Sequence, residues 1–119
     1  MTNETKTPEP LKIYISGQIT GLNFQEAKGM FERGEREAIT LFSCICGGDN
    51  ERIKPINPMK LDHAPGSEWE DYMEKDIAEL LRCQGIYMLQ NWRRSKGARV
   101  EHAIAKELGL PIIYQTDEI

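Results

Sequence analysis

The chain has 119 residues, of which 39% are hydrophobic, and its 19 acidic and 15 basic side chains give a formal net charge of -4. This length predicts one globular domain and excludes two. Most of the acidic excess lies near the two ends of the chain. The nearly neutral body between them argues against duplex nucleic acid as a partner.

The composition also bears on cell compartment and cofactors. No apolar run is long enough to span a membrane, and the first residues lack the pattern of a signal peptide. We therefore expect a cytoplasmic protein with no membrane partner. The cysteines at positions 44, 46 and 83 have no spacing that suits zinc. They are interpreted as reduced structural thiols, and neither a metal nor another cofactor is expected.

The first third of the chain predicts a strand and a helix. Residues 1–10 are polar and are predicted to form a disordered leader, followed by a single domain over residues 11–119. Residues 11–16 form a β-rich run that ends at a glycine and predicts the first strand. A helix is predicted over residues 24–42, with Asn23 as its N-cap.

The middle of the chain predicts two strands around a helix. Residues 52–57 form a poorer strand, whose Pro55 favours an edge position. A helix is predicted over residues 68–83, with Ser67 as its cap. Residues 85–89 are apolar throughout, which is typical of a strand buried on both faces.

The last third completes an alternating pattern. A third helix is predicted over residues 96–108, capped by Ser95 and ended by Gly109, before a strand over residues 111–114. This order of strands and helices predicts a parallel sheet with helices on both faces. Ligands bind such sheets at the carboxyl ends of the strands. The loops expected there are 17–23, 57–67 and 90–97.

Two carboxylates fall on apolar helix faces. Because a helix turns about 100° per residue, the face of each side chain follows from its position. Asp76 and Glu101 each lie within an apolar stripe, and a buried carboxylate is unfavourable unless it is paired, hydrogen-bonded or facing a cavity. The two stripes are formed by Trp69, Tyr72, Met73, Ile77 and Leu80, and by Ala98, Val100, Ile104, Ala105 and Leu108.

A pair of such carboxylates suits glycosyl chemistry, in which one attacks an anomeric carbon and the other moves protons. Glu101 suits the nucleophile, because helix N-terminal amides and basic neighbours would keep it ionised. Those neighbours are Arg93, Arg94, Lys96 and Arg99. Asp76 suits the acid/base, because its apolar surroundings would raise its pKa. For either residue alone, a loop cap or an arginine partner is the better explanation. The two together, with Glu101 at the expected ligand edge, favour a functional site.

Other candidate residues are open to two interpretations. The glycines of the loop at residues 17–21 would let backbone amides approach a phosphate or sugar, but the loop is equally explained as a simple turn. Trp92 is placed either to stack on a base or to cover the sheet edge. His63 and His102 are isolated from any nucleophile, and His102 is expected to be solvated.

Four segments resemble a known family. They are IYISGQITG at 13–21, WEDYMEKDI at 69–77, CQGIYML at 83–89 and SKGARVE at 95–101. Together they resemble the nucleoside 2-deoxyribosyltransferase superfamily, and most closely its small bacterial and phage branch labelled DUF4406. The most specific element is Ser-x-Gly-x-x-x-Glu, which 2'-deoxynucleoside 5'-monophosphate N-glycosidases also carry. With the element order, the resemblance implies a flavodoxin-like (Rossmannoid) three-layer sandwich with a mainly parallel sheet of four to five strands.

The resemblance also implies roles for particular residues. Glu101 corresponds to the nucleophile on the deoxyribose anomeric carbon, Asp76 to the acid/base, and Tyr14 to a tyrosine that lines the pocket. Ser95 corresponds to a serine at the 5' end of the nucleotide. The monophosphate glycosidases carry an arginine where this chain has Thr20. The full set of expected substrate-binding residues is Ser16, Gly17, Gln18, Ile19, Trp92, Ser95 and Gly97.

The expected function is cleavage or transfer of the N-glycosidic bond of a (deoxy)nucleoside or nucleotide through a glycosyl-glutamate intermediate. Members of the family form dimers or larger oligomers in which a neighbour completes the pocket, so a homo-oligomer is expected. The leading alternative is a non-catalytic nucleotide-sensing module on the same fold. A third possibility is an oligomeric scaffold with a vestigial pocket.

Overall fold

The computed structural model describes residues 9–116, so most of the expected leader and residues 117–119 lie outside the description. In this range the chain forms a four-stranded, all-parallel sheet in the order β2-β1-β3-β4, which is a flavodoxin-like topology. The strands are β1 (Leu11–Ser16), β2 (Ile53–Ile56), β3 (Gly85–Met88) and β4 (Ile112–Tyr114). The predicted fold class is confirmed.

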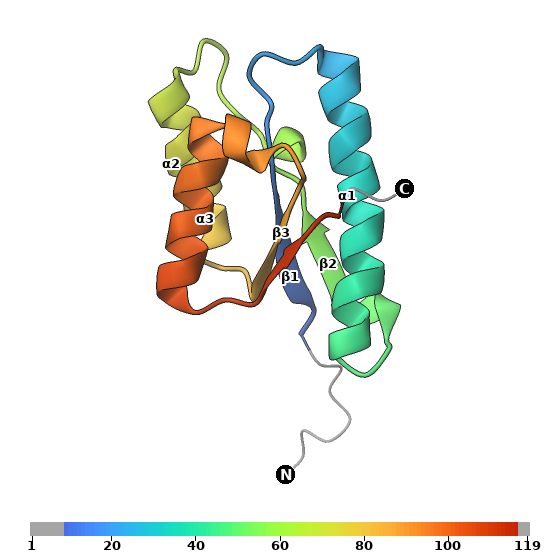
Figure 1. The fold of residues 1–119 in the computed structure, drawn as a ribbon. Coiled ribbons are helices and arrows are strands. Elements are labelled where there is room, and N and C mark those ends of the chain that lie inside the picture. The colour runs from blue at the N-terminus through green and yellow to red at the C-terminus, as the bar shows by residue number, and fades with distance from the viewer. Residues whose placement is uncertain (1–8, 117–119) are drawn as a thin grey trace.

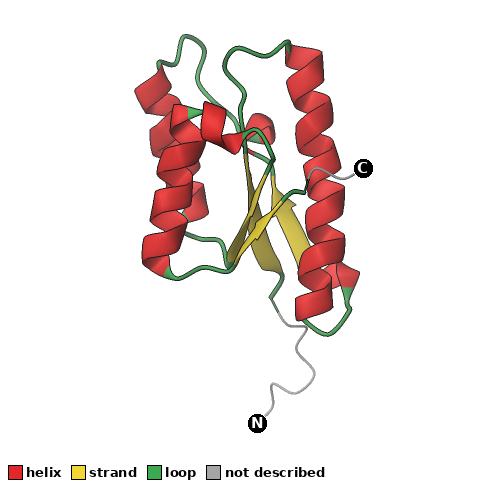
Figure 2. Ribbon diagram, viewed as in Figure 1, coloured by secondary structure: helices red, strands yellow, loops and turns green. Residues whose placement is uncertain are grey.

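The helices lie on opposite sides of the sheet. They are α1 (Phe24–Ile45), α2 (Trp69–Leu80) and α3 (Lys96–Leu108). Figure 1 shows α1 on one face and both α2 and α3 on the other, with the sheet between them. The same three layers are visible in Figure 2, where the strands form the central layer. None of the helices in the described part of the chain is long and apolar enough to cross a membrane.

Two of the predicted helix caps are confirmed. The Asn23 side chain accepts hydrogen bonds from the backbone amides of residues 25 and 26 at the start of α1. Ser95 accepts from the Ala98 amide at 3.1 Å at the start of α3. Gly109 ends α3 with a φ of 72°, in the left-handed region that favours glycine.

The predicted limits of the middle helix are wrong at both ends. Glu68 is the N-cap of α2, and its amide donates to the Asp71 carboxylate at 2.9 Å, while the Ser67 hydroxyl turns back to the carbonyl of residue 64. The helix stops at residue 80 because Gln84 already pairs with β1, where its amide donates to the Lys12 carbonyl at 2.8 Å.

Short 3-10 turns also form in the predicted loops, at Pro58–Lys60 and Trp92–Arg94, and before β2 at Asn50–Arg52.

The core has two halves, one on each face of the sheet. Side chains alternate along β1, so Ile13 and Ile15 pack toward α1 while Tyr14 packs toward α2 and α3. β3 is buried over its whole length, as predicted. The three cysteines are free thiols.

Some members of the predicted apolar stripes are exposed. Trp69 and Tyr72 keep 40% and 43% of their surface exposed, because the first turns of α2 border a cavity instead of the sheet. Leu108 is 50% exposed at the last turn of α3. Each apolar stripe is therefore buried in the middle of its helix. The start of α2, with Trp69 and Tyr72, and the end of α3, with Leu108, lie outside the core.

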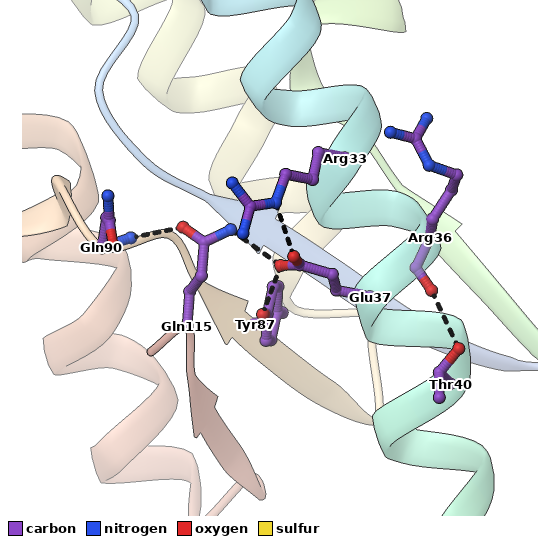
Figure 3. A network of polar contacts seen from close by, with 7 residues as sticks. All are labelled: Arg33, Arg36, Glu37, Thr40, Tyr87, Gln90 and Gln115. Carbon is purple, nitrogen blue, oxygen red and sulfur yellow. Dashed lines mark hydrogen bonds and ion pairs between the residues drawn. The ribbon is translucent and has the colours of Figure 1, made fainter. Parts of the chain in front are cut away.

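A polar network fastens α1 to the sheet on the side away from α2 and α3. Figure 3 shows the Glu37 carboxylate at its centre. It accepts hydrogen bonds from the Tyr87 hydroxyl, the Gln115 amide and the Arg33 side chain, each at 2.7 Å. Partial burial raises the pKa of Glu37, but these three donors outweigh it and lower the pKa overall. The same carboxylate, together with burial, raises the pKa of Tyr87.

Two glycines of α1 are expected to respond in opposite ways to substitution. At Gly34, a Cβ atom would lie 2.7 Å from Leu89 Cδ2 and 3.2 Å from Ile15 Cγ2, so Gly34→Val should lower the free energy of unfolding by about 2 kcal/mol or more. At Gly29 a Cβ atom meets nothing within 4 Å. Gly29→Ala should therefore raise stability by about 0.5–1 kcal/mol through its helix propensity. Urea unfolding of both variants measures the difference, and equal effects would contradict the close packing of α1 on the sheet.

Candidate active site

A cavity of about 540 Å³ opens at the carboxyl ends of the strands. Both carboxylates singled out from the helix faces line it, Asp76 from α2 and Glu101 from α3. They keep only 7% and 5% of their surface exposed, which confirms their predicted burial. The predicted substrate-binding residues that also line the cavity are Gly17, Ile19, Ser95 and Gly97.

The Glu101 carboxylate is held by two hydroxyl groups from β1. The Tyr14 hydroxyl donates to Oε2 at 2.9 Å, and the Ser16 hydroxyl donates to Oε1 at 2.6 Å. Both residues are fully buried, and neither lines the cavity. The structure therefore places Tyr14 and Ser16 behind the carboxylate.

Burial dominates the protonation of Glu101. Burial, with a smaller effect of the Asp76 charge, raises the pKa of Glu101 to about 7, against the opposing effect of the hydrogen bonds from Ser16 and Tyr14. Burial and the nearby carboxylates also raise the pKa of Tyr14. The expectation that basic neighbours keep Glu101 ionised is therefore wrong.

Three of the four basic residues near Glu101 in the sequence have partners elsewhere. The Arg93 guanidinium lies 4.7 Å from the centre of the Trp92 ring, and Arg99 donates to the Arg93 carbonyl at 2.8 Å. Lys96 Nζ lies 4.3 Å from the centre of the Trp69 ring. None of the four, Arg94 included, is among the residues that line the cavity.

Asp76 has a partner that the sequence did not predict. His63 lines the cavity, and its Nε2 atom lies 3.3 Å from Asp76 Oδ1. Its ring centre also lies 4.3 Å from that of Tyr72. Burial raises the pKa of Asp76, although the hydrogen bond and charge of His63 and the charge of Lys75 oppose the shift.

His63 reaches the cavity because its loop is fastened at both ends. Buried Asn57 donates to Glu35 Oε2 at 2.7 Å and accepts from the amide of residue 59 at 2.9 Å. At the other end, the Lys75 ammonium donates to the Asp62 carbonyl. The only sequence signal for His63 is its position in the loop at 57–67, which was expected at the ligand edge.

Ser95 and Gly97 bring the start of α3 to the cavity. A Cβ atom at Gly97 would lie 2.9 Å from the Met73 sulfur, so glycine lets α3 and α2 approach closely at this point. Ser95 lines the cavity and is also the N-cap of α3.

Besides Ser16, two further predicted binding residues, Gln18 and Trp92, lie outside the cavity lining. Gln18 turns its amide nitrogen toward the Thr20 carbonyl at 3.1 Å, and its backbone amide donates to the Asn91 side chain at 3.1 Å. Trp92 is 8% exposed and belongs to the core on the α3 side of the sheet. The His102 ring covers it at 4.2 Å, so the expectation that His102 is simply solvated is wrong.

The entrance of the cavity is apolar and largely aromatic. Its exposed large hydrophobic side chains are Ile19, Phe24, Trp69 and Tyr72. No lysine or arginine among the described residues lines the cavity. Within residues 9–116 no group of three or more His, Cys, Asp or Glu side chains is arranged to hold a metal ion.

Comparison with known families gives one match. Residues 11–114 match the family described as a domain of unknown function, DUF4406. Because the match covers most of the chain, the protein belongs to this family. Searches of curated proteins and of solved structures found no significant match.

Proposed function

For this member of the DUF4406 family, we propose cleavage or transfer of the N-glycosidic bond of a (deoxy)nucleoside or nucleotide through a glycosyl-Glu101 intermediate. One observation carries the proposal: two buried carboxylates, Glu101 and Asp76, line the same cavity from different helices. Glycosyl transfer with a covalent intermediate needs such a pair, one as nucleophile and one as acid/base. We further propose that this chain is a relative of the nucleoside 2-deoxyribosyltransferase superfamily, which its sequence motifs resemble.

In the first step, Glu101 acts as the nucleophile. Its ionised carboxylate donates an electron pair to the anomeric carbon of the sugar, and the bond from that carbon to the base nitrogen breaks. The electron pair of the broken bond stays on the base, which takes a proton from Asp76. Burial supports this role, because it raises the pKa of Asp76 and favours the neutral form that holds a proton.

In the second step, the glycosyl ester is broken. Water or a second base attacks the anomeric carbon, the bond to the Glu101 oxygen breaks, and the electron pair returns to the carboxylate. Asp76 takes up the proton that the attacking group loses. Hydrolysis and transfer therefore share the first step and differ only in the acceptor. His63, in contact with Asp76, is placed to exchange this proton with it.

The aromatic entrance supports a flat leaving group. Trp69, Tyr72 and His63 line the same cavity as Asp76, and ring faces of this kind stack on heteroaromatic bases. In this arrangement the base lies toward α2, where Asp76 reaches it. The sugar lies toward the start of α3 and Glu101.

A trapping experiment tests the proposal. A panel of 2-fluoro-arabinosyl nucleosides and their monophosphates is incubated with the protein, and the intact mass is measured. We expect a covalent glycosyl adduct, which peptide mapping should locate on Glu101. Glu107→Gln, a change of an exposed glutamate on the same helix, should still trap, whereas Glu101→Gln should not. If no member of the panel gives an adduct on Glu101, the proposal fails.

The same panel separates catalysis from sensing. A non-catalytic sensor would bind a nucleotide without releasing free base, and Glu101→Gln would leave its affinity nearly unchanged. A scaffold with a vestigial pocket would show no thermal shift with any nucleotide. Chromatography of the wild-type reactions for free base therefore separates catalysis from the other two possibilities, and the thermal shift separates a sensor from a scaffold.

Self-association is part of the proposal. The exposed apolar side chains at the entrance include Phe24, which is 64% exposed, and clusters of this kind mark ligand or partner contacts. A homodimer or larger homo-oligomer that covers this entrance would exclude water from the cavity. Sedimentation equilibrium measures the oligomeric state, and a monomer at micromolar concentration would remove this part of the proposal.

A further inference from the structure

Ser16 occupies an unusual place for a residue expected to bind substrate. It is the last residue of β1, has 0% of its surface exposed and does not line the cavity. Its hydroxyl instead donates to Glu101 Oε1 at 2.6 Å. Any substrate in the cavity meets Glu101 before it reaches Ser16.

We propose that Ser16 is a positioning residue for the glycosyl reaction, whose hydroxyl fixes the orientation of the Glu101 carboxylate and does not contact the substrate. This inference rests on the function proposed above. It replaces the substrate-binding role that the sequence suggested for Ser16.

The geometry of β1 explains how one carboxylate comes to have two hydroxyl partners. Side chains two residues apart point to the same face of a strand, so Tyr14 and Ser16 both face α3, while Ile15 between them packs toward α1. Each hydroxyl takes a different oxygen of Glu101. With both oxygens held, the carboxylate plane cannot rotate freely about its last side-chain bond.

The backbone leaves Ser16 little freedom to move. Ser16 pairs with Met88 in the register of β1 and β3, and its carbonyl accepts from the Leu89 amide at 2.8 Å. The hydroxyl is thus a fixed donor on a rigid strand, which is the arrangement that keeps a reacting group in an attack geometry. Each carboxylate oxygen keeps a further lone pair for the substrate.

The same hydrogen bond affects ionisation. The groups that act on Glu101 are Ser16 and Tyr14 from β1, whose hydrogen bonds lower its pKa, and Asp76 from α2, whose charge raises it. His63 lies beyond Asp76 and is in contact with it. Removing the Ser16 hydroxyl should therefore leave less of Glu101 ionised at neutral pH.

Ser16→Ala is the first test, with Ser43→Ala as the matched control. Ser43 is also a buried serine whose hydroxyl has an internal partner, the Thr40 carbonyl at 2.9 Å, but it lies on α1, away from the cavity. For Ser16→Ala we expect kcat to fall about 10- to 100-fold, KM to change less than about twofold, and the acidic limb of the pH profile to move up by about one unit. Ser43→Ala should change none of the three.

A second measurement does not depend on activity. The carboxyl carbon of Glu101 is followed by NMR in protein labelled with ¹³C-glutamate, and its signal is assigned by its loss in Glu101→Gln. In Ser16→Ala we expect the titration of Glu101 to move to higher pH than in the wild type. Should this variant fail to fold, Ser16→Cys keeps the side-chain volume with a weaker donor and should give a smaller shift in the same direction.

The outcomes separate the two proposals. A KM that rises more than about tenfold with unchanged kcat would show that Ser16 contacts substrate and would overturn the inference. An unchanged Glu101 titration in the variants would overturn it as well. If the wild type cleaves nothing while the titration still shifts, the proposed function fails but the coupling of Ser16 to Glu101 stands.

Discussion

Replacing Glu101 with glutamine is expected to lower kcat for glycosidic cleavage by at least about 10³-fold and, at pH 8, to make the protein more stable. An amide cannot form the glycosyl ester, so the covalent step is lost. Glutamine has nearly the same shape: its amide oxygen can accept from one of the two hydroxyls of Tyr14 and Ser16, and its NH2 group can donate to the other. The loss of activity should therefore come without loss of the fold.

The gain in stability follows from the direction of the pKa shift. Burial raises the pKa of Glu101 from 4.5 to about 7 in the folded protein. The folded state therefore holds a proton that the unfolded state releases, and stability falls as the pH rises between these two values. By pH 8 the ionised, buried carboxylate costs the wild type about 3 kcal/mol relative to pH 4.

Urea unfolding at pH 5 and pH 8 measures this difference. Glu101→Gln has no titrating group at this position, so it should be close to the wild type at pH 5 and about 2–3 kcal/mol more stable at pH 8. Glu107→Gln, the exposed change on the same helix, should follow the wild type at both values. Parallel pH profiles for the wild type and Glu101→Gln would contradict a raised pKa of this carboxylate.

Replacing Asp76 with asparagine is expected to lower kcat by about 10²–10³-fold, but only for substrates whose base must be protonated as it leaves. An N7-methylated purine nucleoside carries a positive charge on its base, which departs without taking a proton. For this substrate the loss should shrink to less than about tenfold. Single-turnover release of base from both substrates measures the two effects.

The control for this prediction is Glu74→Gln, a change of an exposed carboxylate on the same helix. It should leave both rates unchanged. An equal loss of rate on the ordinary and the methylated nucleoside in Asp76→Asn would mean that Asp76 only binds the substrate. General acid catalysis by Asp76 would then be excluded.

The fold and the two buried carboxylates could be predicted because each depends on a short stretch of sequence. Helix geometry alone places Asp76 and Glu101 on apolar faces, and both are buried. Pro55 alone suggests that β2 is an edge strand, and the strand order confirms it. The same local argument predicts burial for Trp69, which is exposed. The position of a residue on a helix face does not show whether that face packs on a sheet or borders a cavity.

The immediate surroundings of the carboxylates could not be predicted, because they come from distant parts of the chain. Ser16 and Glu101 are 85 residues apart and meet only through the pairing of β1 with the rest of the sheet. His63 approaches Asp76 from a loop whose path is set by Asn57 and Lys75. Closeness in sequence was a poor guide here, since Arg99 lies two residues from Glu101 and turns away from it.

Pro55 also limits how copies of this protein can assemble. It lies on the outer strand of the sheet, paired with Ile13 on one side, and it has no N–H group to offer a further strand. Exposed Lys54 next to it adds a charge to the same edge. Growth of a continuous sheet across this edge, the usual start of fibril formation, is therefore disfavoured. Copies that associate at this edge are therefore expected to do so through side chains, without extending the sheet.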